Sequence, residues 1–204
     1  MRIGIYGGSF DPIHIGHLWI GEAAMETLAL DELRWIPVAQ SPLKGRGPIA
    51  ADQARLGMLH LALDAVDGHA IDDREIRRGE ISYTVDTVGE LRSDFPDAEI
   101  IMIIGSDSLA TMPQWHRPKE LLESVIPAVV QRGGEDEIDF SILKDFVSPQ
   151  RIELFRRHVI AMPVIELSSS EMRERLASGR SIRFRTPRSV EAFIQAENLY
   201  RQSE

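Results

Sequence analysis

Short apolar runs alternate with helix-like segments along this chain, and this alternation restricts the folds open to it. We expect strands at six places: Arg2–Tyr6, Leu33–Val38, His69–Asp72, Ile100–Ile104, Ile126–Val130 and His158–Met162. Helical spacing is expected in the segments between and after them: His17–Leu30, Asp52–Val66, Tyr83–Phe95, Lys119–Ser124, Ser170–Ala177 and Pro187–Tyr200. Continuous Ile/Val runs separated by helices favour a parallel sheet that is covered on both faces. The chain is therefore predicted to be α/β, a Rossmann-like, doubly wound parallel sheet in one domain (1–204) with a small helical C-terminal part from about 165 to 204.

The bulk composition narrows the function classes. A chain of 204 residues, 43% of them apolar, is long enough for one good core. No apolar run approaches the roughly 18 residues needed to cross a bilayer, and the N-terminus lacks the features of a signal peptide, so we expect a cytoplasmic protein without a membrane partner. The absence of cysteine excludes disulfides, thiolate nucleophiles and Cys-ligated zinc. A net charge of −9 disfavours nucleic acid as a partner but leaves room for a small anion in a locally basic pocket.

Residues that could contact a ligand are concentrated in three of the segments that follow predicted strands. These segments are Gly7–His17, Pro37–Lys44 and Gly105–Trp115. Ligands of open parallel sheets bind beyond the carboxyl ends of the strands, so the three segments are expected to share one rim.

The segment Gly7–His17, with the sequence GGSFDPIHIGH, is the most informative of the three. Gly7 and Gly8 permit a positive φ and a close approach of a ligand to the backbone, although a plain tight turn is the ordinary alternative. Three interpretations of His14 and His17 compete: a zinc pair, which lacks a clear third ligand, a core histidine, and a phosphate clamp at a helix N-terminus. The neighbouring glycines and hydroxyl favour the phosphate clamp, and we predict no metal site made by the protein alone.

Further candidates each have a plain structural alternative. Lys44 lies in a loop, where most lysines are simply solvated, but its place after the second strand favours a phosphate contact. Ser82-Tyr83-Thr84 opens a helix and fits a capping box as well as a carboxylate site. Asp107 could cap the next helix, hold a ribose hydroxyl or hold a metal-bound water. Trp115 is either a core side chain or a flat stacking surface for an aromatic ring.

Ser168-Ser169-Ser170 places three hydroxyls at a predicted helix start, with Arg173 one turn inside. Ordinary N-capping explains the serines. The functional alternative is a second anion site that faces the first, to which Arg173 brings a permanent positive charge.

Together these segments resemble the bacterial nicotinate-mononucleotide adenylyltransferases of the nucleotidylyltransferase superfamily. The resemblance rests, in chain order, on GGSFDPIHIGH at 7–17, SPLK at 41–44, SYT at 82–84, GSDSL with Trp115 at 105–115, SSSEMR at 168–173 and the closing Pro187–Tyr200 helix. The motifs cover nearly the whole chain. The two histidines and the serine-rich element indicate the superfamily, and SYT with the tryptophan indicates the pyridine-mononucleotide branch.

The resemblance implies transfer of the adenylyl group of ATP to nicotinate mononucleotide, giving nicotinate adenine dinucleotide and pyrophosphate in NAD biosynthesis, with Mg²⁺ accompanying ATP. It implies a catalytic role for a first set of residues: His14, His17, Lys44 and Arg173. It implies ATP contacts for a second set: Gly7, Gly8, Ser9, Phe10, Gly105, Asp107, Ser169 and Ser170. It implies contacts to the mononucleotide from a third set: Lys44, Tyr83, Thr84, Trp115 and His116.

Two departures and several alternatives stay open. Many relatives carry histidine where this chain has Leu43, which weakens the assignment of the mononucleotide phosphate to Lys44, and many carry another aromatic residue at the position of His116. The alternatives are a different phosphate acceptor (nicotinamide mononucleotide or phosphopantetheine) and a non-catalytic nucleotide sensor. The sequence leaves the oligomeric state open, and a homo-oligomer is compatible with it.

Overall fold

A six-stranded, wholly parallel sheet forms the centre of the computed structural model, which describes residues 1–42, 47–134 and 136–201. The strand order is β3-β2-β1-β4-β5-β6. The strands are β1 (Arg2–Gly8), β2 (Glu32–Pro37), β3 (His69–Ile71), β4 (Glu99–Gly105), β5 (Ile126–Arg132) and β6 (Val159–Met162). Strand order reverses between β1 and β4, and this doubly wound arrangement confirms the predicted fold class.

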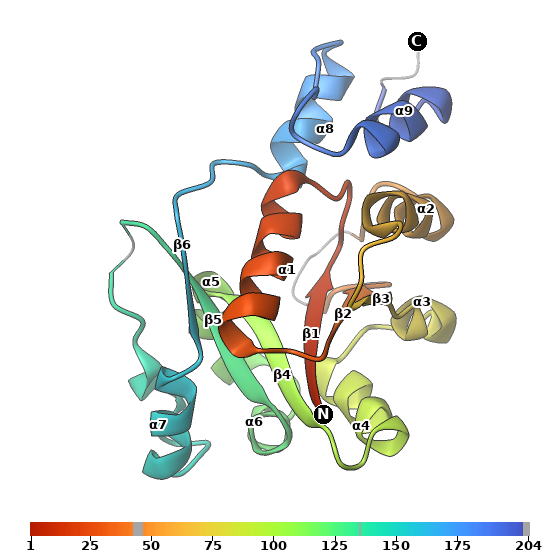
Figure 1. The fold of residues 1–204 in the computed structure, drawn as a ribbon. Coiled ribbons are helices and arrows are strands. Elements are labelled where there is room, and N and C mark those ends of the chain that lie inside the picture. The colour runs from red at the N-terminus through yellow and green to blue at the C-terminus, as the bar shows by residue number, and fades with distance from the viewer. Residues whose placement is uncertain (43–46, 135, 202–204) are drawn as a thin grey trace.

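Helices cover both faces of the sheet, with α1 in front of it and α5 behind it in Figure 1. The α-helices are α1 (Ile15–Leu28), α2 (Asp52–Leu63), α3 (Arg74–Arg78), α4 (Thr84–Asp94), α5 (Ser106–Thr111), α6 (Pro118–Ser124), α7 (Pro149–Arg156), α8 (Ser169–Ala177) and α9 (Arg188–Ala196). Two short 3₁₀ helices are η1 (Met112–Gln114) and η2 (Phe140–Leu143). No helix of the described residues is long and apolar enough to cross a membrane.

The core is densest where the strand order reverses. The run Ile100–Ile104 of β4 is buried at every position, because this strand lies between β1 and β5 and carries helices on both faces. Such burial explains why the run is apolar throughout instead of alternating. A rigid strand at this place fixes the carboxyl ends of β1 and β4 side by side.

The C-terminal helices α8 and α9 lie beyond the carboxyl ends of the strands, at the top of Figure 1. Two backbone-anchored contacts join them to the loop between β1 and α1: Ile15 N–H donates to the Arg185 carbonyl at 2.9 Å, and Thr186 Oγ1 donates to the Ile13 carbonyl at 2.8 Å. On α9, Ser189 Oγ donates to the Leu61 carbonyl of α2 at 2.9 Å. The C-terminal part is thereby fixed to the rim of the sheet.

Several local expectations need correction. Gly7 and Gly8 both lie within β1 and neither has a positive φ, whereas Phe10 takes the left-handed conformation with φ 45°. The helix that begins at Asp52 ends at Leu63, before Val66. No side chain caps α4 or α5, so the caps expected from Ser82, Thr84 and Asp107 do not form. The final helix ends at Ala196, before Tyr200.

Candidate active site

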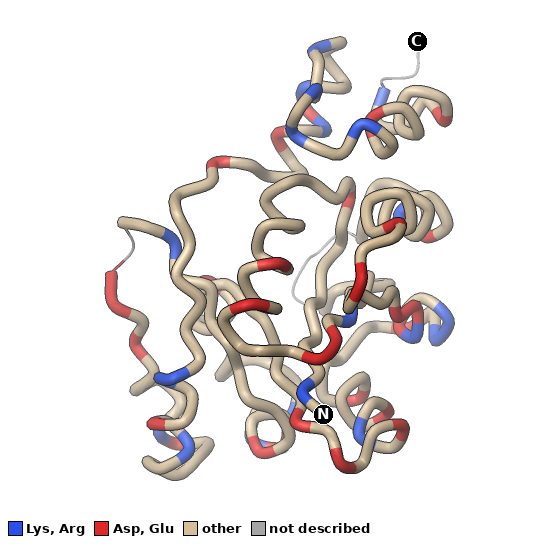
Figure 2. Tube along the Cα trace, in the orientation of Figure 1, with Lys and Arg blue, Asp and Glu red and all other residues tan. Residues whose placement is uncertain are grey.

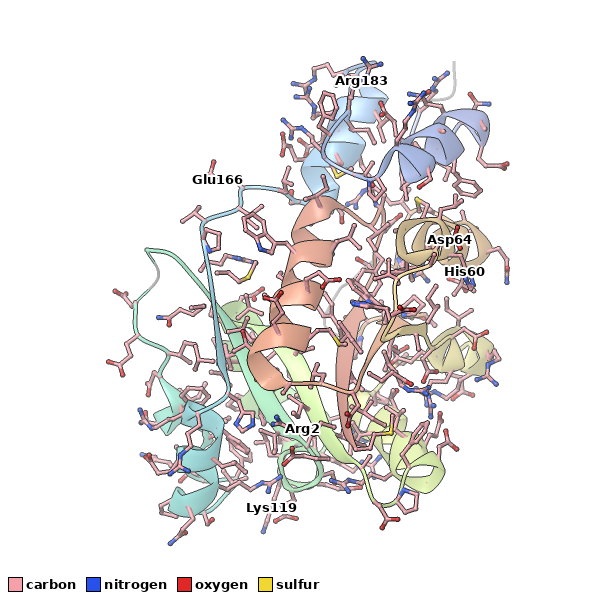
Figure 3. All side chains as sticks on the ribbon, in the orientation of Figure 1. Arg2, His60, Asp64, Lys119, Glu166 and Arg183 are labelled. Atoms are coloured by element: carbon pink, nitrogen blue, oxygen red, sulfur yellow. The ribbon has the colours of Figure 1, made fainter. Side chains whose placement is uncertain are left out.

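A cleft of about 950 Å³ opens at the carboxyl edge of the sheet. It lies between the β1–α1 loop on one side and the ends of β5 and β6 with the β6–α8 linker on the other; Glu166, labelled in Figure 3, marks that linker. Six of the residues proposed from the sequence line this cleft: Ser9, His14, His17, Ser169, Ser170 and Arg173. The structure therefore brings together two motifs that are more than 150 residues apart in the chain.

The floor beside the cleft is made by the end of β1. Gly7 is exposed, and a Cβ built on it would meet no atom within 4 Å, so the backbone here is open to a ligand. Phe10 is buried against the rings of Tyr6 and His17, at centroid distances of 5.6 and 5.2 Å. Because its side chain is buried against the ring of His17, a contact between Phe10 and a ligand would have to use the backbone.

The two histidines form a reciprocal cap at the start of α1. His17 N–H donates to His14 Nδ1, and His14 N–H donates to His17 Nδ1, both at 3.3 Å, and the rings stack with centroids 3.6 Å apart. An imidazole nitrogen that accepts a hydrogen bond carries no proton, so in each neutral ring the proton lies on Nε2. Burial lowers the pKa of His14 to about 4, which keeps this ring neutral at pH 7. The pair can thus present Nε2–H donors to an anion in the cleft.

Helix α8 supplies the cleft with hydroxyls and a cation. Ser168 is the N-cap and accepts from Glu171 N–H, as ordinary capping predicts. Ser169 Oγ donates to the Pro12 carbonyl at 2.9 Å, which binds the start of α8 to the β1–α1 loop. Arg173 donates to the Asp11 carbonyl at 2.6 Å and to Ser170 Oγ at 3.1 Å. These contacts fix a guanidinium charge at the cleft edge.

Three charged or hydroxyl groups near the cleft were not identified from the sequence. Asp11 is 2% exposed and accepts hydrogen bonds from three neutral donors, described below. Arg55 of α2 is fully buried and donates to the Ser9 carbonyl at 2.9 Å and to Asp52 at 2.5 Å. Arg132, at the end of β5, lines the cleft opposite His14 and His17. Asp11 stood within the quoted motif, but Arg55 and Arg132 carry no local signal that sets them apart from ordinary helix and strand residues.

A second group of predicted residues lies on the same rim outside the residues that line the cleft. The ring of Tyr83, just before α4, lies 4.3 Å from the ring of His116, between η1 and α6. Arg117 forms an ion pair with Asp86 in the first turn of α4. These contacts place the start of α4, with Thr84, beside Trp115 and His116. Within the described residues, no hydrogen bond occupies the N–H groups of Thr84 and His116.

The remaining predicted residues lie as follows. Gly8 ends β1, and a Cβ built on it would stand 3.0 Å from Phe10 Cζ, so a larger residue would displace that ring. Gly105 ends β4, and a Cβ there would stand 2.4 Å from Asp107 Oδ1, so this glycine lets the carboxylate of α5 fold back over the strand end. Trp115 Nε1 donates to Thr111 Oγ1 at 3.3 Å. Lys44 lies outside the described residues.

Ser82 links the segment just before α4 to the loop after β2. Its Oγ accepts from Ala39 N–H at 3.2 Å, and its own N–H donates to the Gln40 carbonyl at 2.9 Å. Thr87 donates to the buried carboxyl of Glu75 at 2.7 Å beneath it. Burial raises the pKa of Glu75, although the hydroxyls of Thr87 and Ser82 oppose that rise. The loops after β1, β2 and β4 thus share one rim, as predicted.

The charge distribution fits an anionic ligand despite the net charge of −9. Figure 2 shows Lys and Arg gathered along the α8–α9 part beyond the sheet and acidic residues on α1. The basic residues from α8 to the start of α9 are Arg173, Arg175, Arg180, Arg183, Arg185 and Arg188. Local field, not net charge, governs capture of a small anion at this edge.

Comparisons with known proteins agree with this geometry. A family model for cytidylyltransferase-like proteins matches residues 5–175. A probable nicotinate-nucleotide adenylyltransferase of Rhodopirellula baltica is 48% identical over 199 residues, which cover 98% of this chain and 93% of that protein. One of the same description from Salinibacter ruber is 36% identical over the full length of both chains. The solved structure of Plasmodium falciparum nicotinic acid mononucleotide adenylyltransferase complexed with NaAD shares the fold, with a TM-score of 0.76, 22% identity, and coverage of 98% of this chain and 97% of that one.

Proposed function

This chain belongs to the cytidylyltransferase-like family and, within it, to the nicotinate-nucleotide adenylyltransferases, and from that membership we infer its reaction. It transfers the adenylyl group of ATP to nicotinate mononucleotide, producing nicotinate adenine dinucleotide and pyrophosphate. The observation that carries this assignment is the joining of His14 and His17 with Ser169, Ser170 and Arg173 around one cleft, with the predicted acceptor residues on the same rim.

The cleft is assigned to ATP. The Nε2–H groups of His14 and His17 would donate to its phosphates, and Arg173 would place a permanent positive charge on them. Hydroxyls of Ser169 and Ser170 at the start of α8 add donors at a helix N-terminus, where partial positive charge favours phosphate. Gly105 and Asp107, at the end of β4, are assigned to the adenosine side.

The acceptor is assigned to the rim between α4 and α6. The N–H groups of Thr84 and His116 suit the nicotinate carboxylate, because charged acceptors make the stronger hydrogen bonds to such donors. Trp115 is assigned to stack on the pyridine ring. Lys44, outside the described residues, is assigned to the mononucleotide phosphate.

The chemistry is an in-line displacement at the α-phosphorus of ATP. A phosphate oxygen of nicotinate mononucleotide forms the new bond to this phosphorus, and the bond from it to the bridging oxygen breaks, so that pyrophosphate leaves with the electron pair. The nucleophile is already an anion at neutral pH and needs no general base. The protein therefore positions two anions and stabilises charge that grows on the leaving group.

We propose Mg²⁺ as the ion that accompanies ATP. Mg²⁺ that accompanies a nucleotide is held chiefly by phosphate oxygens and water. When bound, Mg²⁺ would neutralise phosphate charge.

Pyrophosphate release tests this function directly. We expect release only when ATP, Mg²⁺ and nicotinate mononucleotide are all present, and none when any one is omitted. Tight ATP binding without turnover on nicotinate mononucleotide, nicotinamide mononucleotide or phosphopantetheine would contradict the assignment and indicate a nucleotide sensor instead.

A further inference from the structure

The carboxylate of Asp11 is buried at the centre of a junction that the assigned roles leave unused. Its Oδ2 accepts from Ile49 N–H at 2.6 Å, and its Oδ1 accepts from Ala50 N–H at 3.1 Å. Oδ1 also accepts from the hydroxyl of Tyr200 at 2.7 Å, across 189 positions of the chain. Three neutral donors therefore occupy this carboxylate inside the protein.

Arg173 lies beside this carboxylate without forming a close pair with it. Its Nη1 is 3.9 Å from Asp11 Oδ2, while the same nitrogen donates to the Asp11 backbone carbonyl at 2.6 Å. An Arg–carboxylate pair free to relax prefers two parallel hydrogen bonds below 3 Å. Here the N–H and O–H donors hold the carboxylate oxygens, so the guanidinium stays at the cleft edge, where Ser170 also binds it.

Tyr200 is the donor of the three that a substitution can remove cleanly. Burial, and to a smaller extent the hydrogen bond to Asp11, raise the pKa of its hydroxyl well above the ordinary range. The hydroxyl therefore stays protonated and can donate. The charges of both Arg173 and Arg55 act on it, so both cations lie near this hydroxyl. The end of the chain therefore reaches the phosphate-binding machinery.

We propose that Tyr200 is a positioning residue for ATP binding: by occupying Asp11, its hydroxyl prevents Asp11 from drawing Arg173 out of the cleft. The proposal rests on the assignment of the cleft to ATP and adds a role for Tyr200, the last residue of the predicted C-terminal helix, to which the sequence assigned no contact. Loss of the hydroxyl would leave Oδ1 with the Ala50 N–H alone, shorten the contact between Arg173 and Asp11, and reduce the positive charge offered to the phosphates.

The test is a double-mutant cycle on Tyr200→Phe and Arg173→Ala, with the dissociation constant of a non-hydrolysable ATP analogue measured by calorimetry. Since a hydrogen bond to a charged group contributes on the order of tenfold or more in an equilibrium constant, we expect Tyr200→Phe to weaken analogue binding about tenfold. In the Arg173→Ala background the same substitution should change binding less than about twofold, because the two residues act through one contact.

The matched control is Ser189→Ala. It removes one hydroxyl that also anchors the C-terminal part, through the bond to the Leu61 carbonyl, but it touches neither Asp11 nor Arg173. We expect Ser189→Ala to lower the melting temperature while leaving analogue binding unchanged. Analogue binding that survives Tyr200→Phe intact would reduce Tyr200 to a structural anchor like Ser189, and independent, multiplying effects of the two substitutions would exclude action through Arg173.

Because the readout is binding, the test is separate from the proposed reaction. A chain that bound the analogue and showed the coupling, yet released no pyrophosphate, would refute the reaction and support the positioning role. Full turnover with no coupling between Tyr200 and Arg173 would do the reverse.

Discussion

The two halves of the proposed site are held together in different ways. On the ATP side, side chains bind backbone groups of distant segments: Arg173 and Ser169 hold the carbonyls of Asp11 and Pro12, and Arg55 holds that of Ser9. On the acceptor side, an aromatic contact between Tyr83 and His116 and an ion pair between Asp86 and Arg117 join two helix starts.

This difference predicts different responses to substitution. Residues on the ATP side hold the loops in place and are also the ones we propose to contact the phosphates, so single changes there should affect turnover strongly. Residues on the acceptor side offer a flat ring and backbone N–H groups, so single changes there should affect mainly the affinity for the mononucleotide. The predictions below test that contrast, from the largest expected effect to the smallest.

Arg173→Ala should cause the largest loss. The substitution removes the cation that we assign to the leaving phosphates, and the loss of one such transition-state contact lowers kcat by roughly 10²- to 10³-fold. Steady-state kinetics with both substrates saturating measures it. Arg175→Ala on the same helix is the control, because the Arg175 guanidinium donates to the Ser181 carbonyl and is not among the residues that line the cleft, and the kcat of this variant should match the wild type.

His14→Asn should rank second. Asparagine is a good N-cap and can still accept from His17 N–H, but it lacks the Nε2–H donor. We expect a fall in kcat of about 10²-fold, the lower end of the range for one lost donor to a developing charge. The exposed His60 of α2, labelled in Figure 3, provides the matched control His60→Asn, which should keep full activity. Equal losses in both variants would argue against a role for the His14 donor.

Trp115→Ala should act on the acceptor alone. Aromatic stacking contributes about 0.5–1.5 kcal/mol, so the KM for nicotinate mononucleotide should rise up to about tenfold while the KM for ATP stays constant. Trp19→Ala controls for loss of an indole, since Trp19 is half exposed on α1 and does not line the cleft. A rise in the KM for ATP instead would remove the separation between the two halves.

The smallest expected effect concerns pH. Burial lowers the pKa of His14 to about 4 in the folded protein. As the pH falls below the ordinary pKa of histidine, this imidazole therefore becomes protonated in the unfolded chain before it does in the folded protein. His14 should therefore lower the free energy of unfolding by about 1 kcal/mol when the pH is lowered from 7 to about 5.5. This loss should be absent in His14→Asn. Urea denaturation of both proteins at the two pH values measures it; parallel losses in both would show that His14 titrates normally.

The sequence predicted the sheet well because its signals are local. The buried run Ile100–Ile104 and the other five strands were all placed, with ends shifted by one or two residues. Helix α7 was missed although Ser148-Pro149 is an N-cap followed by proline at the first helical position, a recognisable start signal. The short helices α3 and α5 were missed because five or six residues show no periodicity.

Only the site residues that belong to recognisable sequence motifs were predicted. His14, His17 and Arg173 were found because their types and spacing are distinctive, and they line one cleft. Tyr200 and Arg55, which bind Asp11 and the Ser9 carbonyl of the β1–α1 loop, were not found, because their contacts depend on tertiary packing. The same limit explains the error on Gly7 and Gly8: composition indicated conformational freedom, whereas neither has a positive φ, and the small size of Gly8 leaves room for the Phe10 ring.

The specificity for the acid form of the mononucleotide tests the central assignment most directly. With ATP and Mg²⁺ fixed, kcat/KM for nicotinate mononucleotide is compared with that for nicotinamide mononucleotide in one preparation. The N–H groups of Thr84 and His116 would lose a charged acceptor in the amide, and a lost charge-assisted hydrogen bond is worth about 1.5–3 kcal/mol, so we predict a ratio of at least tenfold in favour of the acid. An equal or higher kcat/KM for the amide would contradict the account.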